Sequence, residues 1–173
     1  SQTPQLFGEN HQPTKDYLAI PRVFSEHRRW TTCAHLTPET IAGDKVYTCD
    51  DADGFAFSII ESSMFLAWQK AVGGRLKSDP SFSNTIVWNN IPLPTVPPEL
   101  KIAICNAGRQ VIDVRTTFPN ETLASLYSPV GMHPELIRAH EYLDTLVDKA
   151  FGLSQPAKDE AERLTLLFKL YAE

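Results

Sequence analysis

The stretch of residues 73–94, GGRLKSDPSFSNTIVWNNIPLP, combines glycines, cations, an acid and paired asparagines. In phosphate-binding loops glycines precede a lysine and a serine or threonine, much as they precede Lys77 and Ser78 here. Such a loop follows a strand and opens a helix, so that phosphate meets the backbone N–H groups of the helix N-terminus. The glycines here follow a predicted helix instead, and the C-terminal end of a helix carries partial negative charge that repels phosphate. The order of elements therefore argues against nucleotide binding.

A metal-dependent nuclease and an amino-methyltransferase can each be partly matched to the same region. The nuclease needs acidic metal ligands and a lysine that converge, and Asp79, Glu99 and Lys101 have a suitable spacing. Glu99 and Lys101 follow a proline-rich run, however, where an acid is expected as a complement to the dipole of a starting helix. The methyltransferase loop needs two adjacent prolines and an aromatic residue, which the run from Asn89 to Pro92 lacks. The sequence therefore predicts no catalytic residue.

The cysteine and glycine patterns predict neither a metal site nor a cofactor site. Cys33, Cys49 and Cys105 include no Cys-x-x-Cys pair, and no second ligand pair accompanies Cys33 and His35. No glycine-rich loop follows a predicted strand, so S-adenosylmethionine is not expected to bind in the usual way. Widely spaced cysteines in odd number favour a reducing compartment, and we expect a cytoplasmic protein.

What remains between residues 73 and 94 is a set of hydrogen-bond donors and acceptors. Side chains of these types commonly contact phosphate oxygens and base edges of nucleic acids, and glycines let a backbone approach a duplex closely. The set comprises Arg75, Lys77, Ser78, Ser81, Ser83, Asn84, Asn89 and Asn90. From the residues alone, this stretch is either a nucleic-acid contact or a solvated loop between a helix and a strand.

Short segments rich in β-branched and aromatic residues precede and follow this loop. YLAIPRVF, RWTTCAHL, KVYTC and TIVW are predicted as strands, with Pro21 confining the first to an edge or a bulge. Between them, apolar residues at helical spacing over residues 57–72 predict one helix, with Gly73 as a left-handed cap at its end. The loop is thus expected to lie at the end of a helix packed on a modest sheet.

After the prolines at positions 92–98 the pattern becomes helical. Apolar residues at three- and four-residue steps predict a helix over residues 100–114 and a short one over 123–126, capped by Asn120. Pro134 is predicted as the first residue of a third helix that ends at Gly152, and a fourth is expected from about Pro156 to Tyr171. The predicted fold class is α+β, with a small β-rich domain and one packed helix, followed by an all-α antiparallel helical bundle.

Length and charge limit the class of protein. The 173 residues are 42% hydrophobic and 21% charged, which is typical of a soluble globular protein, and no apolar run is long enough to span a bilayer. A net charge of -5 argues against binding nucleic acid through overall charge, so any such role needs a local patch. The chain opens with Ser1 and a polar segment, residues 1–16, that we expect to be flexible; we expect a fragment of a longer protein.

Three segments in order resemble type IIL, MmeI-like restriction-modification enzymes. AWQKAVGGRLKSDPSFSNTIVWNNIPLP is similar to the family's AW-x-x-(A/T)-VGGR-(L/I)-KSD run, and YLAIPRVFSEHRRW resembles its Y-L-x-(I/L)-P-R segment. LASLYSPVGMHPELIRAHEYLDTLVDKAFG is similar to a C-terminal segment of the family. The chain departs from the family pattern at Pro80 and Ser81, where an aromatic residue and an arginine are usual, and at Trp88, Ile91 and Leu93.

The resemblance implies a non-catalytic DNA-recognition fragment. In that family one chain carries a nuclease, a helical spacer, an adenine-N6 methyltransferase, a target recognition domain and a C-terminal helical domain. This chain resembles the later part of the recognition domain, residues 17–96, and the helical domain, residues 97–173. The implied partners are double-stranded DNA and the other domains of the parent, which would bind S-adenosylmethionine, and Mg²⁺ if a nuclease is fused.

Two groups of side chains are then expected to contact DNA. The first is Arg75, Lys77, Ser78, Ser83, Asn84 and Asn89, and the second is Arg22, Glu26, Arg28 and Arg29. Arginine suits a guanine edge, and glutamate can accept a hydrogen bond from cytosine. Each of these residues could instead be a surface residue or part of a structural ion pair. The alternative for the whole chain is a helical interaction module that orients the domains of a larger DNA-modifying enzyme.

Overall fold

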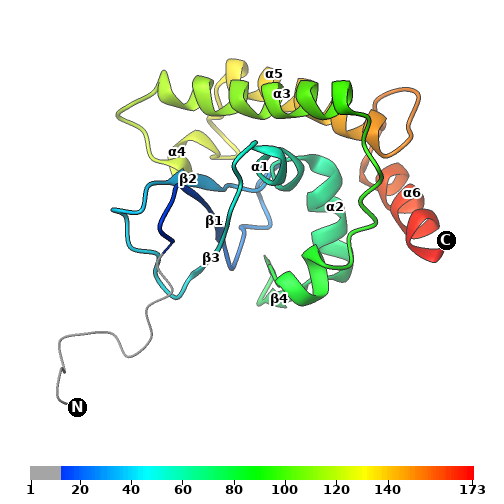
Figure 1. Ribbon diagram of the computed structural model, residues 1–173, viewed down its shortest axis with the longest axis horizontal. Coiled ribbons are helices and arrows are strands. Elements are labelled where there is room, and N and C mark those ends of the chain that lie inside the picture. The colour runs from blue at the N-terminus through cyan, green and yellow to red at the C-terminus, as the bar shows by residue number, and fades with distance from the viewer. Residues whose placement is uncertain (1–12) are drawn as a thin grey trace, which may run out of the picture.

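The computed structural model describes residues 13–173 (Figure 1). The predicted flexible segment of residues 1–16 falls mostly on residues 1–12, which lie outside the described residues. The observed elements are an antiparallel sheet, a pair of short helices and a hairpin, followed by a helical region (Figure 1). The predicted α+β class is therefore confirmed.

The sheet has the order β2-β1-β3, formed by β1 (Tyr17–Pro21), β2 (Ala34–Leu36) and β3 (Val46–Cys49). Both pairings are antiparallel, and Ala19 lies between Ala34 and Thr48. The expectation that Pro21 confines its strand to an edge or a bulge is wrong, because β1 is the central strand and Pro21 pairs with Val46 in an unbroken register. Pro21 is the last residue of β1, where a proline interrupts the ladder least.

The single predicted helix of residues 57–72 is two helices, α1 (Phe55–Ile60) and α2 (Ser63–Val72). Asp51 begins α1 by accepting hydrogen bonds from the N–H groups of Ala56 and Phe57, at 2.9 and 3.0 Å. Ser62 begins α2, because its hydroxyl accepts a hydrogen bond from the N–H of Phe65 at 3.2 Å. The apolar spacing alone predicts one helix, but the capping serine in the middle of the segment divides it into two.

Gly73 ends α2, but the predicted left-handed cap is wrong, since its φ of -73° and ψ of 157° are extended. The glycine is required by space instead. A Cβ atom built on Gly73 would lie 2.4 Å from the carbonyl oxygen of Gln69 and 2.5 Å from its side-chain nitrogen. The chain then forms a hairpin of β4 (Gly74–Leu76) and β5 (Asp79–Ser81).

The predicted strand TIVW is also wrong, because residues Asn84–Trp88 form a π-helical turn, η1. Local hydrogen bonds favour the turn: the hydroxyl of Ser83 accepts from the N–H of Ile86 at 3.2 Å, and the N–H of Asn89 donates to the carbonyl of Asn84 at 2.8 Å. The side chain of Asn90 adds hydrogen bonds to two further carbonyl groups of the turn. Polar side chains on both sides thus outweigh the β propensity of the short apolar run.

The C-terminal half contains α3 (Pro98–Thr116), α4 (Leu123–Leu126), α5 (Pro134–Ala150) and α6 (Glu160–Ala172). Pro134 is the first residue of α5 as predicted. The predicted cap of α4 is wrong, because Thr122 rather than Asn120 fills that position. The last helix starts later than expected, after the capping side chain of Asp159.

The helices of the C-terminal half pack on the N-terminal half as well as on one another. Helix α3 packs against both α5 and α1, and α6 packs against α2 (Figure 1). The buried core is a single cluster with members from both halves, among them Trp30, Phe57, Trp68, Ile104 and Leu143. Across residues 13–173, no helix combines the length and apolarity needed to cross a membrane.

Candidate nucleic-acid interface

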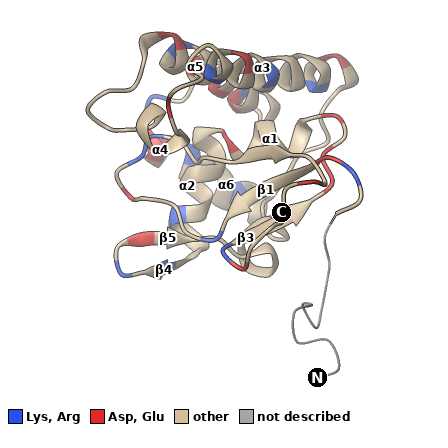
Figure 2. Ribbon diagram, turned by 90° about the vertical axis from the view of Figure 1, so that its left-hand side faces the viewer, with Lys and Arg blue, Asp and Glu red and all other residues tan. Residues whose placement is uncertain are grey.

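The β4–β5 hairpin carries Arg75, Lys77 and Ser78 of the first predicted group and lies at one end of the molecule (Figure 2). Arg75 pairs with Pro80 across the hairpin, and its Nη1 donates a hydrogen bond to the carbonyl of Ser78 at 2.9 Å. Lys77 occupies the turn in a left-handed conformation, with φ of 59°. The side chains of Arg75, Lys77 and Ser78 are exposed. The hairpin therefore carries two exposed cations, Arg75 on β4 and Lys77 in the turn.

The second predicted group begins beside this hairpin. The N–H of Phe24 donates to the carbonyl of Pro80 at 2.9 Å, and the N–H of Phe82 donates to the carbonyl of Arg22 at 2.8 Å. The N–H of Glu26 donates to Asp79 Oδ1 at 2.9 Å. The segment from Arg22 to Glu26 therefore runs along β5, which brings Arg22 and Glu26 of the second group beside the hairpin.

The arginines of the second group differ in the residues that they contact within the protein. Arg22 is exposed, and its guanidinium lies 5.3 Å from the ring centroid of Tyr47 and donates to the carbonyl of Asp44 at 3.1 Å. Arg28 donates to the hydroxyl of Thr32 at 2.7 Å. Arg29 pairs with Glu141 of α5 at 3.2 Å. All three arginines thus have partners within the protein, and Arg22 also lies beside the hairpin through its backbone.

Ser83, Asn84 and Asn89 surround η1, and part of their hydrogen-bonding capacity stabilises that turn. Besides capping the N–H of Ile86, the hydroxyl of Ser83 lies 3.0 Å from the hydroxyl of Thr85. The side-chain oxygen of Asn84 accepts from the N–H of Thr85 at 2.9 Å. The side chains of Asn84 and Asn89 are exposed, so their remaining donors and acceptors face solvent next to the hairpin.

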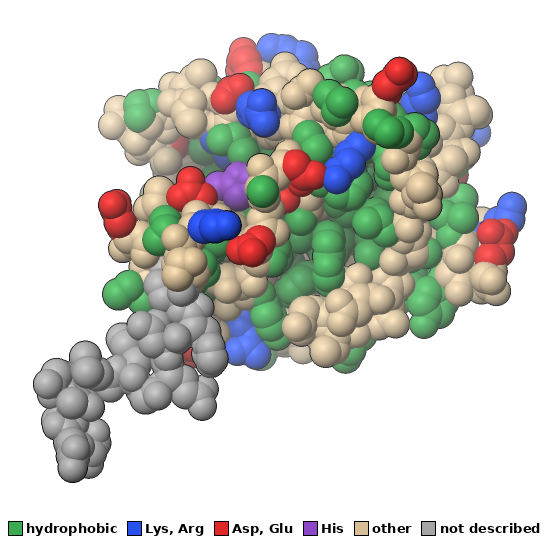
Figure 3. Space-filling model, in the orientation of Figure 1, with side chains coloured by type: hydrophobic (Ala, Val, Ile, Leu, Met, Phe, Trp, Pro, Cys, Tyr) green, Lys and Arg blue, Asp and Glu red, His purple; other side chains and the backbone are tan. Residues whose placement is uncertain are grey.

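An apolar pocket that the sequence did not indicate lies between β3 and η1. Its volume is about 240 Å³, and its lining includes Tyr47, Phe82 and Trp88, with Asn84 and Asn89 also part of it. A hollow lined by apolar side chains is visible on this face in Figure 3. The signal available in the sequence was the pair Phe82 and Trp88 in one stretch and Tyr47 in another, and only the fold brings Tyr47 to the other two.

The residues of the nuclease alternative have different partners. The carboxylate of Asp79 accepts from the N–H of Glu26, whereas Lys101 Nζ lies 2.7 Å from Asp53 Oδ2. Within residues 13–173, no group of three or more His, Cys, Asp and Glu side chains could hold a metal ion. Burial raises the pKa of the Cys49 thiol to about 11, so this group is a protonated thiol at neutral pH.

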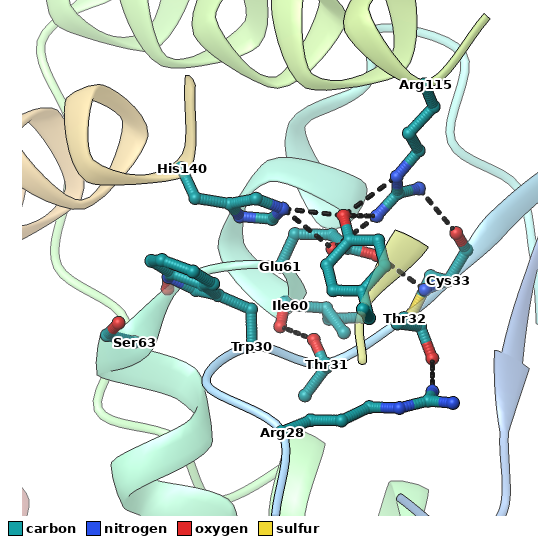
Figure 4. A network of polar contacts seen from close by, with 12 residues as sticks. Arg28, Trp30, Thr31, Thr32, Cys33, Ile60, Glu61, Ser63, Arg115 and His140 are labelled. Carbon is teal, nitrogen blue, oxygen red and sulfur yellow. Dashed lines mark hydrogen bonds and ion pairs between the residues drawn. The ribbon is translucent and has the colours of Figure 1, made fainter. Parts of the chain in front are cut away.

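A buried polar network joins the two halves (Figure 4). Arg115, in the last turn of α3, donates to Glu61 Oε2 at 2.7 Å and to the carbonyl of Cys33 at 2.9 Å. It also donates to the hydroxyl of Tyr127 through Nε at 2.8 Å. That hydroxyl lies 2.6 Å from Nε2 of His140, a residue with no exposed surface. The network was missed because its members lie far apart in the sequence.

A second set of buried contacts centres on Asp144 of α5. Trp30 Nε1 donates to Asp144 Oδ2 at 2.9 Å, and the backbone N–H of Ser63 donates to Oδ1 at 2.7 Å. The hydroxyl of Ser63 donates to Oδ2 at 2.6 Å. Burial raises the pKa of this carboxyl above its usual value, against the effect of these hydrogen bonds.

Comparison with known proteins gives two family matches that together span the chain. Residues 1–95 match the MmeI target recognition domain, and residues 96–173 match the MmeI C-terminal domain. DNA methyltransferase A of Bacillus subtilis (strain 168) is 37% identical over 171 residues, which are 99% of this chain and 19% of that protein. A solved structure of the type IIL restriction-modification enzyme MmeI in complex with DNA has a TM-score of 0.92 and 34% identity, over 99% of this chain and 23% of that chain. The chain therefore spans about a fifth of the length of these relatives.

Proposed function

The chain belongs to the MmeI family, with residues that match its target recognition and C-terminal domains, and we propose that it recognises a specific sequence in double-stranded DNA. In this proposal the chain carries no catalytic residue of its own. A methyltransferase elsewhere in a longer parent would use S-adenosylmethionine, and a fused nuclease would use Mg²⁺. We place this parent in the bacterial cytoplasm, in keeping with the Bacillus relative.

The observation that carries the proposal is the continuous surface formed by the β4–β5 hairpin and the segment from Arg22 to Glu26. It presents Arg22, Arg75 and Lys77, which can bind phosphate or a guanine edge, beside the exposed Glu26, which can accept from cytosine N4. The exposed amides of Asn84 and Asn89 extend the same surface. Ser78 and Ser83 are proposed to contact the DNA backbone. Arg28 and Arg29 are proposed to add contacts through the guanidinium N–H groups that Thr32 and Glu141 leave free.

The test is the binding of the chain to a labelled duplex of about 30 base pairs as the salt concentration rises. The Arg75→Ala, Lys77→Ala variant should bind more weakly than the wild type and show a smaller salt dependence, because fewer phosphates are neutralised. The charge-matched control is Arg138→Ala, Lys149→Ala on α5, on the opposite side of the molecule from the hairpin (Figure 1). Equal loss in both variants would mean that only net charge matters.

Lys77→Asn separates the charge from the backbone conformation at the tip of the hairpin. Asparagine tolerates the left-handed conformation that Lys77 adopts, so the turn should be retained while the cation is lost. Sequence specificity is tested by selecting from a random duplex library. Wild-type protein that enriches no sequence would contradict the specific part of the proposal, whatever its affinity.

A second candidate is a helical module that binds another protein domain. It is supported by Ile102 and Tyr142, large apolar side chains on α3 and α5 that are 61% and 52% exposed. Surface substitution of both by serine should weaken association with the remainder of the parent chain if this candidate is correct. Unchanged DNA affinity in that variant would show that the two roles use separate surfaces.

A further inference from the structure

One carboxylate of the C-terminal half accepts hydrogen bonds from residues adjoining both segments that are predicted to contact DNA. Asp144 of α5 is 7% exposed and accepts hydrogen bonds from Trp30 and Ser63, as described above. Trp30 follows directly after the predicted group from Arg22 to Arg29. Ser63 is the first residue of α2, and α2 leads into the β4–β5 hairpin.

The connection from Trp30 to the surface is short and fixed at both ends. The indole is 1% exposed and stacks on His140, with ring centroids 4.6 Å apart. The guanidinium of Arg29 lies 4.4 Å from the centroid of the Trp30 ring. At its other end the segment is hydrogen-bonded to β5 through Arg22 and Phe24. A displacement of Trp30 would therefore shift the segment that runs along the hairpin.

The connection from Ser63 passes through helix α2, which is buried from Met64 to Gln69. Trp68 Nε1 of this helix donates to the carbonyl of Val87 in η1 at 2.9 Å. Gln69, with no exposed surface, donates through Nε2 to the carbonyl of Ser81 at 2.8 Å, which ties α2 to β5. The position of the α2 N-terminus therefore determines where the hairpin and η1 lie.

We infer that Asp144 is a positioning residue for DNA recognition: it fixes the Arg22–Arg29 group relative to the hairpin, so that both engage one duplex at once. The inference rests on the proposed function. Contacts that are held in their bound arrangement before binding lose less conformational freedom on association, and a site on a well-supported frame keeps its geometry. The C-terminal helices thereby take part in recognition without touching DNA.

Asp144→Asn provides the test, and Asp148→Asn provides the matched control. Asparagine has one side-chain oxygen, so it cannot accept both from Trp30 Nε1, which now donates to Oδ2, and from the backbone N–H of Ser63, which now donates to Oδ1. Asp148 lies one turn further along α5, is also buried and accepts from Arg163 and Ala157, both within the C-terminal half. Both variants lose a buried acceptor, but only the first releases the predicted DNA-contacting segments.

Affinity for a random-sequence duplex is measured between about 50 and 200 mM salt, at a temperature where circular dichroism shows both variants folded. Asp144→Asn should bind about tenfold more weakly, equivalent to one charge-assisted contact, and its salt slope should fall by about one unit. Asp148→Asn should match the wild type. Wild-type affinity and slope for a folded Asp144→Asn variant would overturn the inference.

If Asp144→Asn does not fold, Trp30→Phe tests the positioning role of Asp144 instead. It removes the indole N–H that Asp144 accepts and retains an aromatic ring to stack on His140. The same loss of slope is expected, and wild-type binding would overturn the inference. The Arg75→Ala, Lys77→Ala variant separates the two claims. If that variant binds like the wild type, the proposed function fails; if it binds weakly while Asp144→Asn and Trp30→Phe do not, only the positioning role fails.

Discussion

His140 occupies the point where α5 meets the buried polar network, and its ring has one satisfied nitrogen. Nε2 lies 2.6 Å from the hydroxyl of Tyr127, whereas Nδ1 is buried without a partner among the described residues. A buried N–H without an acceptor is costlier than a bare nitrogen lone pair, so we assign the proton of the neutral ring to Nε2. His140 then donates to Tyr127, which also accepts from Arg115.

This arrangement predicts a loss of stability on acidification. Burial, with a further contribution from the charge of Arg115, lowers the pKa of His140 well below 6.5. Above about pH 6.5 the ring is neutral in both states; below it, the unfolded chain takes up a proton that the folded chain does not. The free energy of unfolding should therefore fall by up to about 1.4 kcal/mol per pH unit from this residue.

The measurement is urea denaturation of the wild type and of His140→Gln from about pH 7.5 to about pH 5. The other groups around the ring, Glu61, Arg115, Tyr127 and Arg29, remain in both proteins, so the difference between the two pH profiles reports His140 itself. Parallel profiles would show that this ring does not remain neutral in the fold.

At the scale of elements, the sequence predicted those whose ends are marked by local residues. Helix α5 begins at Pro134, and Gly152 follows its end with a positive φ of 105°, as the residue types indicated. The predictions that failed concern segments whose conformation depends on contacts with other residues. Gly73 is extended where it lies close against Gln69, which donates a hydrogen bond to β5, and the segment TIVW forms η1 because flanking polar side chains cap it. Neither interaction has a periodic signature in the sequence.

The candidate site was predictable to a similar extent. The hairpin residues Arg75 and Lys77 stand out as cations near glycines, and both are exposed. Their adjacency to the segment around Glu26 was not predictable, because it depends on backbone hydrogen bonds and on Asp79, 53 positions away in the sequence. Likewise, the sequence did not indicate that Arg29 pairs with Glu141, 112 positions away.

Gly73 and Gly74, where α2 leads into the hairpin, give a prediction in which the Gly74 variant is the control for the Gly73 variant. Gly73→Ala would place a methyl group 2.4 Å from the carbonyl oxygen of Gln69, whereas a Cβ at Gly74 meets no atom within 4 Å. Because the obstructing atom belongs to the backbone, relief requires the hairpin to move. We expect Gly73→Ala to destabilise the fold by about 1–3 kcal/mol, and Gly74→Ala to have little effect. Thermal unfolding of the two variants is the test, and similar Tm values would contradict the close approach.

Gly108 provides a second prediction, at the contact between α3 and α1. A Cβ at Gly108 would lie 2.1 Å from Ser58 Oγ and 3.1 Å from Ser58 Cβ. Alanine favours helix by about 1 kcal/mol over glycine, but the steric conflict should outweigh this gain and make Gly108→Ala net destabilising. Adding Ser58→Ala removes the nearer atom and should restore part of the stability. A Gly108→Ala variant more stable than the wild type in urea would show that the helices separate freely.

For the whole molecule, the two family matches meet at positions 95 and 96, but the packing continues across that point. The core cluster contains residues from both sides, and Trp68 of α2 contacts the rings of Phe168 and Tyr171 of α6. Lys70 also pairs with Glu160 at 2.7 Å. The C-terminal helices therefore cover apolar surface of the recognition half, which would otherwise face water.

The Glu61–Arg115 pair makes this dependence testable. Arg115→Met leaves the fully buried Glu61 without its cation, which should cost about 3–5 kcal/mol of unfolding free energy. Replacing both with methionine removes the uncompensated charge, so the double variant should recover much of the loss. Complete recovery is not expected, because the backbone N–H and carbonyl of Cys33 also lose their partners.

Urea denaturation followed by two probes decides whether the loss is shared by both halves. Trp30, Trp68 and Trp88 all belong to residues 1–95, so tryptophan fluorescence reports the recognition half together with the contacts that Trp30 and Trp68 make to α5 and α6. Far-UV circular dichroism is dominated by α3, α5 and α6. Because Arg115 joins the halves through a buried network and a common core, Arg115→Met should shift both transitions to the same lower midpoint. A shift confined to one probe would mean that the halves unfold independently, and that the C-terminal helices only adjoin the recognition half without supporting it.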